Sequence, residues 1–170
     1  DEGYYYRIRN AYFTNYYAAV NASGNVAPKT LVNNDKSFYW VVKKNNDGSV
    51  KLTNAKTGKM AYPANTTADA NVMMGKDYDW MLEKITTDQG QSGIAIVEET
   101  GALSWYTNPS NWANNVIMKP KDWGASIWTF EKLDIAVGIT APMVDNNQQP
   151  TIYYDLQGRR VANPTKGIFI

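Results

Sequence analysis

Three tryptophans in the last third of the first 133 residues have the surroundings of a sugar-binding surface. They are Trp105, Trp112 and Trp123, in the polar stretches WYTNPSNWANN and KPKDWGAS. Sugar rings stack on flat aromatic faces, while amide and hydroxyl groups, here those of Tyr106, Asn108 and Asn111, hydrogen-bond their hydroxyls. The pattern predicts either a glycan-stacking surface or tryptophans that cover one end of the core or pack on the C-terminal tail.

A second aromatic candidate lies earlier in the chain. Tyr62, in MAYPANTT, is placed in a turn beside Pro63. We expect it either to contribute to glycan binding or to pack locally against the turn.

Catalytic chemistry is not indicated by the sequence. The chain has no cysteine and no histidine, which removes thiolate nucleophiles, disulfides, imidazole metal ligands and histidine acid/base catalysis. Glu98 and Glu99 resemble a glycosidase pair, but neighbouring strand residues point to opposite faces and cannot flank one bond, so we expect a solvated turn. The sequence predicts a protein that is not an enzyme and has no cofactor or metal site.

Charge and hydropathy also limit the possible partners. The net charge is +1, and basic residues are dispersed apart from Arg159 and Arg160, so nucleic acid is not an expected partner. No stretch approaches the roughly 20 apolar residues of a membrane span. Hydrophobic residues make up 44% of the chain, and the twelve Tyr and six Trp favour strands. An all-β globular fold is therefore predicted.

The sequence segments that are expected to position these side chains occur as three repeats. YRIRNAYFTNYY, VKLTNAKTGKMA and IAIVEETGALSW start 44 residues apart, at Tyr6, Val50 and Ile94. Each places apolar residues at alternate positions and then reaches a turn, Thr14-Asn15, Thr57-Gly58 or Thr100-Gly101, where Asn or Gly suits a positive φ. Each block predicts a hairpin with one face in the core.

Two further markers recur in the same order. An Asn-Val pair opens a short strand at Asn25, Asn71 and Asn115. A closing apolar strand carries Trp40, Trp80 or Trp128, and these three tryptophans are predicted to fill the core. Units of about 44 residues with roughly four short strands cannot close a core alone, so we expect them to share one.

This pattern resembles the ricin-B-type lectin family, whose repeats begin Y-x-I-x-N-x-x-[ST]-G-x-x-L and end in a Gln-x-Trp strand. The resemblance covers residues 4–133 and implies a β-trefoil with repeats at about 4–47, 48–91 and 92–133. It also implies one sugar site per repeat, built on an Asp after the second strand. Ala19, Tyr62 and Trp105 are aligned with that Asp, and Phe38, Tyr78 and Ser126 replace the Gln. The galactose site of the family is therefore not expected to be intact.

The end of the chain has a different composition. Residues 134–150 contain Gly, Pro, Asn and Gln and are predicted to form a linker. TIYYDLQGRRVANPTKGIFI, residues 151–170, alternates strands and turns and resembles the C-terminal tails of exported bacterial proteins of the type IX secretion kind. That resemblance implies a secreted or cell-surface protein. The alternative is a packing extension of the trefoil.

Together these patterns favour a carbohydrate-binding module covalently linked to the catalytic domain of a larger secreted, glycan-degrading bacterial protein. The expected partner is a glycan or polysaccharide. The alternative is a structural or protein-interaction trefoil that has lost sugar binding and acts as a spacer.

Overall fold

The computed structural model describes residues 3–87, 90–109, 115–137, 153–154 and 160–161. The chain divides into two compact units, residues 1–139 and residues 140–170. The described residues of the first unit form twelve strands, and the predicted all-β fold is confirmed. None of the described residues form a helix that is both long and apolar enough to cross a membrane.

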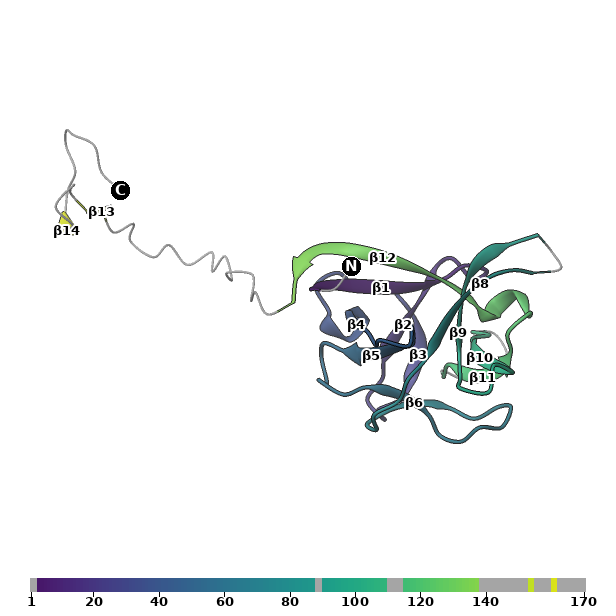
Figure 1. The fold of residues 1–170 in the computed structure, drawn as a ribbon. Helices are drawn as coiled ribbons and strands as arrows, with labels where there is room; N and C mark the ends of the chain where they lie inside the picture. The colour runs from purple at the N-terminus through teal and green to yellow at the C-terminus, as the bar shows by residue number, and fades with distance from the viewer. Residues whose placement is uncertain (1–2, 88–89, 110–114, 138–152, 155–159, 162–170) are drawn as a thin grey trace. The chain divides into compact units, whose positions relative to one another are not determined.

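Six strands of the first unit form a closed barrel (Figure 1). They are β1 (Tyr4–Asn10), β4 (Trp40–Lys44), β5 (Val50–Asn54), β8 (Met81–Thr86), β9 (Ser92–Val97) and β12 (Ile127–Ala136). Antiparallel pairing runs from β5 through β4, β1, β12 and β9 to β8. A bridge between Val50 and Trp80 joins β5 to the start of β8 and completes the ring. Closure leaves the barrel without a free edge.

Three hairpins cover one end of the barrel. Their strands are β2 (Tyr16–Val20) with β3 (Val26–Thr30), β6 (Ala61–Pro63) with β7 (Val72–Met74), and β10 (Leu103–Tyr106) with β11 (Ile117–Pro120). The hairpins are joined to each other by backbone hydrogen bonds, including Val116 N–H to the Val26 carbonyl at 2.7 Å. A six-stranded barrel covered by three hairpins, built from three equivalent repeats, is the β-trefoil arrangement.

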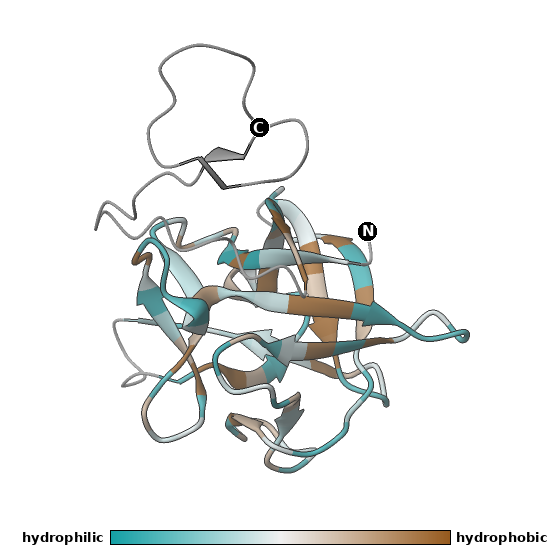
Figure 2. Ribbon diagram, turned by 90° about the vertical axis from the view of Figure 1, so that its left-hand side faces the viewer, coloured by the Kyte–Doolittle hydropathy of each residue, from teal (hydrophilic) through white to brown (hydrophobic). Residues whose placement is uncertain are grey.

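The core follows the alternation of the sequence. Ile8, Leu52 and Ile96 occupy equivalent inward positions of the three repeats and are fully buried. The brown, apolar stretches in Figure 2 lie along the strands, while most connecting loops are teal. At the predicted turns, Gly58 and Gly101 have φ of 65° and 82°, but Asn15 does not adopt a positive φ. The first turn is therefore of another kind.

The three repeat-equivalent tryptophans fill the core as predicted. Trp40, Trp80 and Trp128 are completely buried. Each indole N–H donates to a backbone carbonyl in its own repeat: the oxygens of Ala18, Ala61 and Trp105, at 2.9, 3.0 and 2.9 Å. Partnered burial of this kind avoids the cost of an unsatisfied donor in the core.

Buried polar residues end the first strand of each repeat. Asn10 and Asn54 are fully buried, and each donates its amide to two carbonyls just before a closing strand. Those carbonyls belong to or flank two 3₁₀ turns, η1 (Lys36–Phe38) and η2 (Gly124–Ser126). Glu98 holds the equivalent place in the third repeat. A carboxylate cannot donate, and the segment that it faces, residues 75–79, contains no 3₁₀ turn.

The expectation that Glu98 lies in a solvated turn is wrong, because its side chain is only 1% exposed. Its carboxylate accepts from the Thr100 hydroxyl and from the N–H groups of Thr100, Ala102 and Leu103. Burial raises the pKa of Glu98, but these hydrogen bonds favour the charged form and leave the pKa below its usual range. Glu98 therefore organises the β9–β10 turn instead of facing water.

The boundary of the first unit lies later than the sequence indicated. β12 continues past Leu133 to Ala136, which pairs with Tyr4, and the Val137 N–H donates to the Gly3 carbonyl. In the second unit, β13 (Tyr153–Tyr154) pairs antiparallel with β14 (Arg160–Val161). Most of the predicted linker and most of the predicted tail, residues 151–170, lie outside the described residues.

Candidate functional site

Trp105 is a core residue, so its expected place on a sugar-stacking surface is wrong. It is completely buried, and its ring makes edge-to-face contacts with Trp80, Trp40 and Trp128 at centroid distances of 5.5, 5.7 and 6.2 Å. The residues at the equivalent hydrogen-bonding position of the other repeats are Ala18 and Ala61. Two alanines leave room for one large ring at the centre of the three repeats.

This equivalence also shifts the third repeat by one residue from the sequence alignment. Since Ala18, Ala61 and Trp105 all accept from the core tryptophans, the next residues, Ala19, Tyr62 and Tyr106, form the equivalent set. Strand pairing agrees, because Ala61 faces Met74 as Trp105 faces Met118. Tyr106, not Trp105, stands where the resembled family has its Asp.

Three of the predicted residues do come together on one surface pocket. Tyr106, Asn108 and Trp123 line a cavity of about 470 Å³, a size typical of small-ligand sites. Sequence reasoning missed the rest of the lining, which consists of Tyr12, Phe13, Asp122, Gly124 and Ala125. Tyr12 and Phe13 come from the β1–β2 turn, 93 or more residues away in sequence. Only the closure of β1 against β12 brings them to the third repeat.

Trp123 is the exposed aromatic surface of this pocket, with 45% of the residue accessible to solvent. It stands at the residue before η2, the position at which a side chain usually caps the turn, and makes no capping hydrogen bond. In the first repeat, Asp35 holds the matching place before η1 and accepts from the Ser37 N–H at 2.9 Å. The third repeat thus has an exposed indole where the first has a stabilising cap.

Asn10 joins the two walls of the pocket. Its side-chain oxygen accepts from the N–H groups of Tyr12 and Phe13, at 3.1 and 2.8 Å. Its amide donates to the carbonyls of Ala125 and Ile127, at 2.9 and 3.3 Å. One buried side chain therefore fixes the β1–β2 turn against the η2 segment. A buried residue with all its polar atoms paired is well suited to holding a site rigid.

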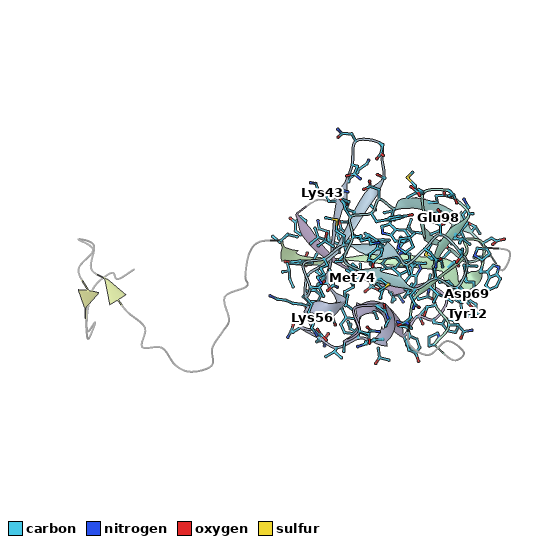
Figure 3. The ribbon with its side chains drawn as sticks, turned by 90° about the horizontal axis from the view of Figure 1, so that it is seen from below. Tyr12, Lys43, Lys56, Asp69, Met74 and Glu98 are labelled. Atoms are coloured by element: carbon cyan, nitrogen blue, oxygen red, sulfur yellow. The ribbon has the colours of Figure 1, made fainter. Side chains whose placement is uncertain are left out.

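Gly124 allows these walls to approach each other closely. A Cβ atom built on Gly124 would lie 3.0 and 3.3 Å from two atoms of the Tyr12 ring. Any side chain at this position would have to displace the Tyr12 ring. Figure 3 labels Tyr12 on the same side of the trefoil as Asp69, whose carboxylate pairs with Lys119 at 2.7 Å. The Lys119 ammonium in turn lies 5.3 Å from the centre of the Trp123 ring.

The remaining predicted site residues are not brought to this pocket by the described structure. Tyr62 is half-buried on β6, with the Lys76 ammonium 5.4 Å from its ring centre and its hydroxyl donating to the Met73 sulfur. Its participation in binding stays a prediction. Asn111 and Trp112 lie outside the described residues.

Comparison with known proteins rests on structure alone, since no family model and no curated protein match the sequence. The chain is similar to the Macrolepiota procera ricin B-like lectin, solved with lactose, at a TM-score of 0.67 and 13% identity, over 78% of this chain and 98% of that one. The fold is a β-trefoil, as in this lectin. The Rhizoctonia solani agglutinin matches at a TM-score of 0.61 and 17% identity, over 78% and 97% of the two chains.

A larger protein also contains a similar domain. A GlcNAcα1-4Gal-releasing endo-β-galactosidase from Clostridium perfringens matches at a TM-score of 0.59 and 18% identity. The match covers 77% of this chain but only 33% of the galactosidase, and the chain likewise matches 50% of a Polyporus squamosus lectin. At such identities these likenesses establish the fold alone.

Proposed function

We propose that this chain is a non-catalytic carbohydrate-binding module of a larger secreted or cell-surface protein. The proposal rests on the pocket in which exposed Trp123 meets Tyr106, Asn108 and Asp122. An indole face offers apolar stacking to a sugar ring, while amide and carboxylate groups can hydrogen-bond its hydroxyls. The chain shares its β-trefoil fold with a lectin and an agglutinin, which agrees with this role.

The proposed site differs from the sugar site of the resembled family in its chemistry. Tyr106 replaces the Asp of that family, and the carboxylate now comes from Asp122, beside η2. The pocket is partly open to solvent, so we expect weak binding that gains strength when a parent protein or a polymeric glycan supplies several contacts. Attachment to a catalytic domain and export through the tail of residues 151–170 belong to the same proposal.

The test is affinity electrophoresis in gels that contain polysaccharides, supported by a glycan array. The chain should be retarded by at least one glycan, and Trp123→Ala should weaken binding about tenfold, because lost stacking and burial amount to roughly 1–2 kcal/mol. Tyr62→Ala is measured beside it, because Tyr62 is the aromatic candidate of the second repeat. Loss of binding in Tyr62→Ala but not in Trp123→Ala would place the site elsewhere.

A structural spacer is the second candidate, and one observation favours it. Trp105 packs in the core, and none of Ala19, Tyr62 and Tyr106 supplies the carboxylate of the resembled family. The same experiment separates the two functions. A folded chain that no polysaccharide retards, and that no glycan on the array retains, would favour the spacer.

A further inference from the structure

The pocket beside η2 has an uncompensated negative charge. Asp122 is the only Asp, Glu, Lys or Arg among the described lining residues, and it makes no ion pair within the described part of the chain. The two nearest cations in sequence are already neutralised. Lys119 pairs with Asp69, and Lys121 pairs with Glu83, each at 2.7 Å. The local sum of charges is therefore set by the Asp122 carboxylate.

Four aromatic residues line the pocket together with Asp122. Tyr12 and Phe13 form an edge-to-face pair at 4.8 Å, and Tyr106 and Trp123 form another at 5.6 Å. Rings at steep angles to each other present both faces and edges to the space between them. The faces of Trp and Tyr attract cations through the ring quadrupole, and the Lys119 ammonium already lies 5.3 Å from the Trp123 ring centre.

We propose that this pocket prefers glycans that carry a free ammonium group, such as oligomers of glucosamine, over neutral and acidic glycans. The preference rests on the proposed glycan-binding function and specifies its ligand class. The ammonium pairs with the Asp122 carboxylate and lies against the aromatic faces, while the apolar face of the sugar stacks on Trp123. The amide of Asn108 in the same lining favours a hydroxyl-rich sugar over a methylated lysine side chain.

The same geometry disfavours acidic sugars. A glycan carboxylate or sulfate in the pocket would face Asp122 without an unpaired Lys or Arg among the described lining residues to neutralise it. Like charges at close range raise the free energy of binding. Acidic oligosaccharides should therefore bind more weakly than neutral ones of the same length.

The test is isothermal titration of the whole chain with glucosamine oligomers and with their N-acetylated counterparts of equal length. At a pH where the sugar amine is charged, the free-amine oligomer should bind about threefold to tenfold more tightly, and the difference should shrink in high salt. Asp122→Asn should bring the ratio of the two affinities to about one, because only the free-amine oligomer loses an ion pair. Glu99→Gln, the same change of charge at an exposed turn outside the pocket, should leave the difference intact.

Each other outcome has a definite meaning. Equal affinity for the two oligomers, or a preference that Asp122→Asn leaves unchanged, would overturn the ammonium preference while the glycan-binding function stands. Binding of a trimethyllysine peptide as tightly as the sugar would overturn the assignment to an amino sugar. No binding of any oligosaccharide would instead reject the proposed function itself.

Discussion

Trp105 shows how a repeated scaffold loses its symmetry at a single residue. Its ring contacts all three of the repeat-equivalent tryptophans, and only one ring of this size fits at their centre. The sequence already contained the signal, because the equivalent positions read Ala18, Ala61 and Trp105. The turns that precede these positions instead align Ala19 and Tyr62 with Trp105, which is one residue too early in the third repeat.

Truncation of Trp105 should destabilise the chain strongly. Trp105→Ala leaves a large cavity among three buried rings, so we expect a loss of about 3–5 kcal/mol in the free energy of unfolding. Urea denaturation followed by circular dichroism measures the loss. Trp123→Ala removes a ring of the same size from the surface and should cost less than about 1 kcal/mol. Equal losses in the two variants would contradict the central place given to Trp105.

Glu98 should make stability depend on acid pH. Its folded pKa is lowered, so the stability that its carboxylate contributes is complete above the unfolded pKa of about 4.3 and disappears as pH falls through the folded pKa. Glu98→Gln should be less stable at neutral pH by about 1–3 kcal/mol, because an amide group now faces the Thr100 N–H. Its remaining stability should fall less between roughly pH 5 and pH 2.

Denaturation curves at several pH values measure this difference. Exposed Glu99→Gln is the control and should follow the parent curve within about 0.5 kcal/mol. A Glu98→Gln variant that loses stability on acidification as steeply as the parent would contradict the role of the buried carboxylate.

At the scale of elements, the strands were predictable, whereas the site was predictable only in part. Apolar residues occur at alternate positions around Ile8, Leu52 and Ile96, and each closing strand contains a Trp. These local patterns predict the barrel strands of the three repeats. The pocket instead combines the β1–β2 turn with η2, and contacts between the first and last strands of a barrel leave no local pattern. The readable signals were the polar surroundings of Tyr106, Asn108 and Trp123, and the place of Trp123 where the first repeat has the capping residue Asp35.

The comparison of Asp35 with Trp123 predicts a substitution that keeps or raises stability but weakens glycan binding. Trp123→Asp restores the side-chain cap that Asp35 provides in the first repeat, so the free energy of unfolding should stay equal or rise by about 0.5–1 kcal/mol. Glycan binding should weaken about tenfold, as in Trp123→Ala, because the indole is lost. Thermal denaturation and affinity electrophoresis of the same preparation measure the two effects. A variant that binds glycan as tightly as the parent chain would show that Trp123 is dispensable.

Substitutions of two buried asparagines can distinguish an effect on stability from an effect on the geometry of the pocket. Asn10→Ala and Asn54→Ala each leave two carbonyls near a 3₁₀ turn without a side-chain donor, and each should cost about 2–4 kcal/mol. Only Asn10 also holds Tyr12 and Phe13, so only Asn10→Ala should weaken glycan binding. Titration at a temperature where both variants are folded compares them. An equal effect of the two on binding would argue against the clamp.

At the scale of the whole molecule, the three repeats share a scaffold but not a site. The segment between the second hairpin and Trp80 is shorter than its counterparts and lacks a 3₁₀ turn, and the first repeat has Asp35 where the third has Trp123. One repeat therefore carries the exposed indole and its neighbouring carboxylate. We expect one glycan per chain at this pocket, and equilibrium titration should return a stoichiometry near one.

The most direct test of the glycan-binding pocket is a ¹H–¹⁵N NMR titration with an oligosaccharide that binds the chain on the glycan array. It follows the six indole N–H signals of the chain. The signal of Trp123 should move in proportion to binding, while those of buried Trp40, Trp80 and Trp128 stay near their starting positions. A saturable titration in which the Trp123 signal does not move would contradict the account.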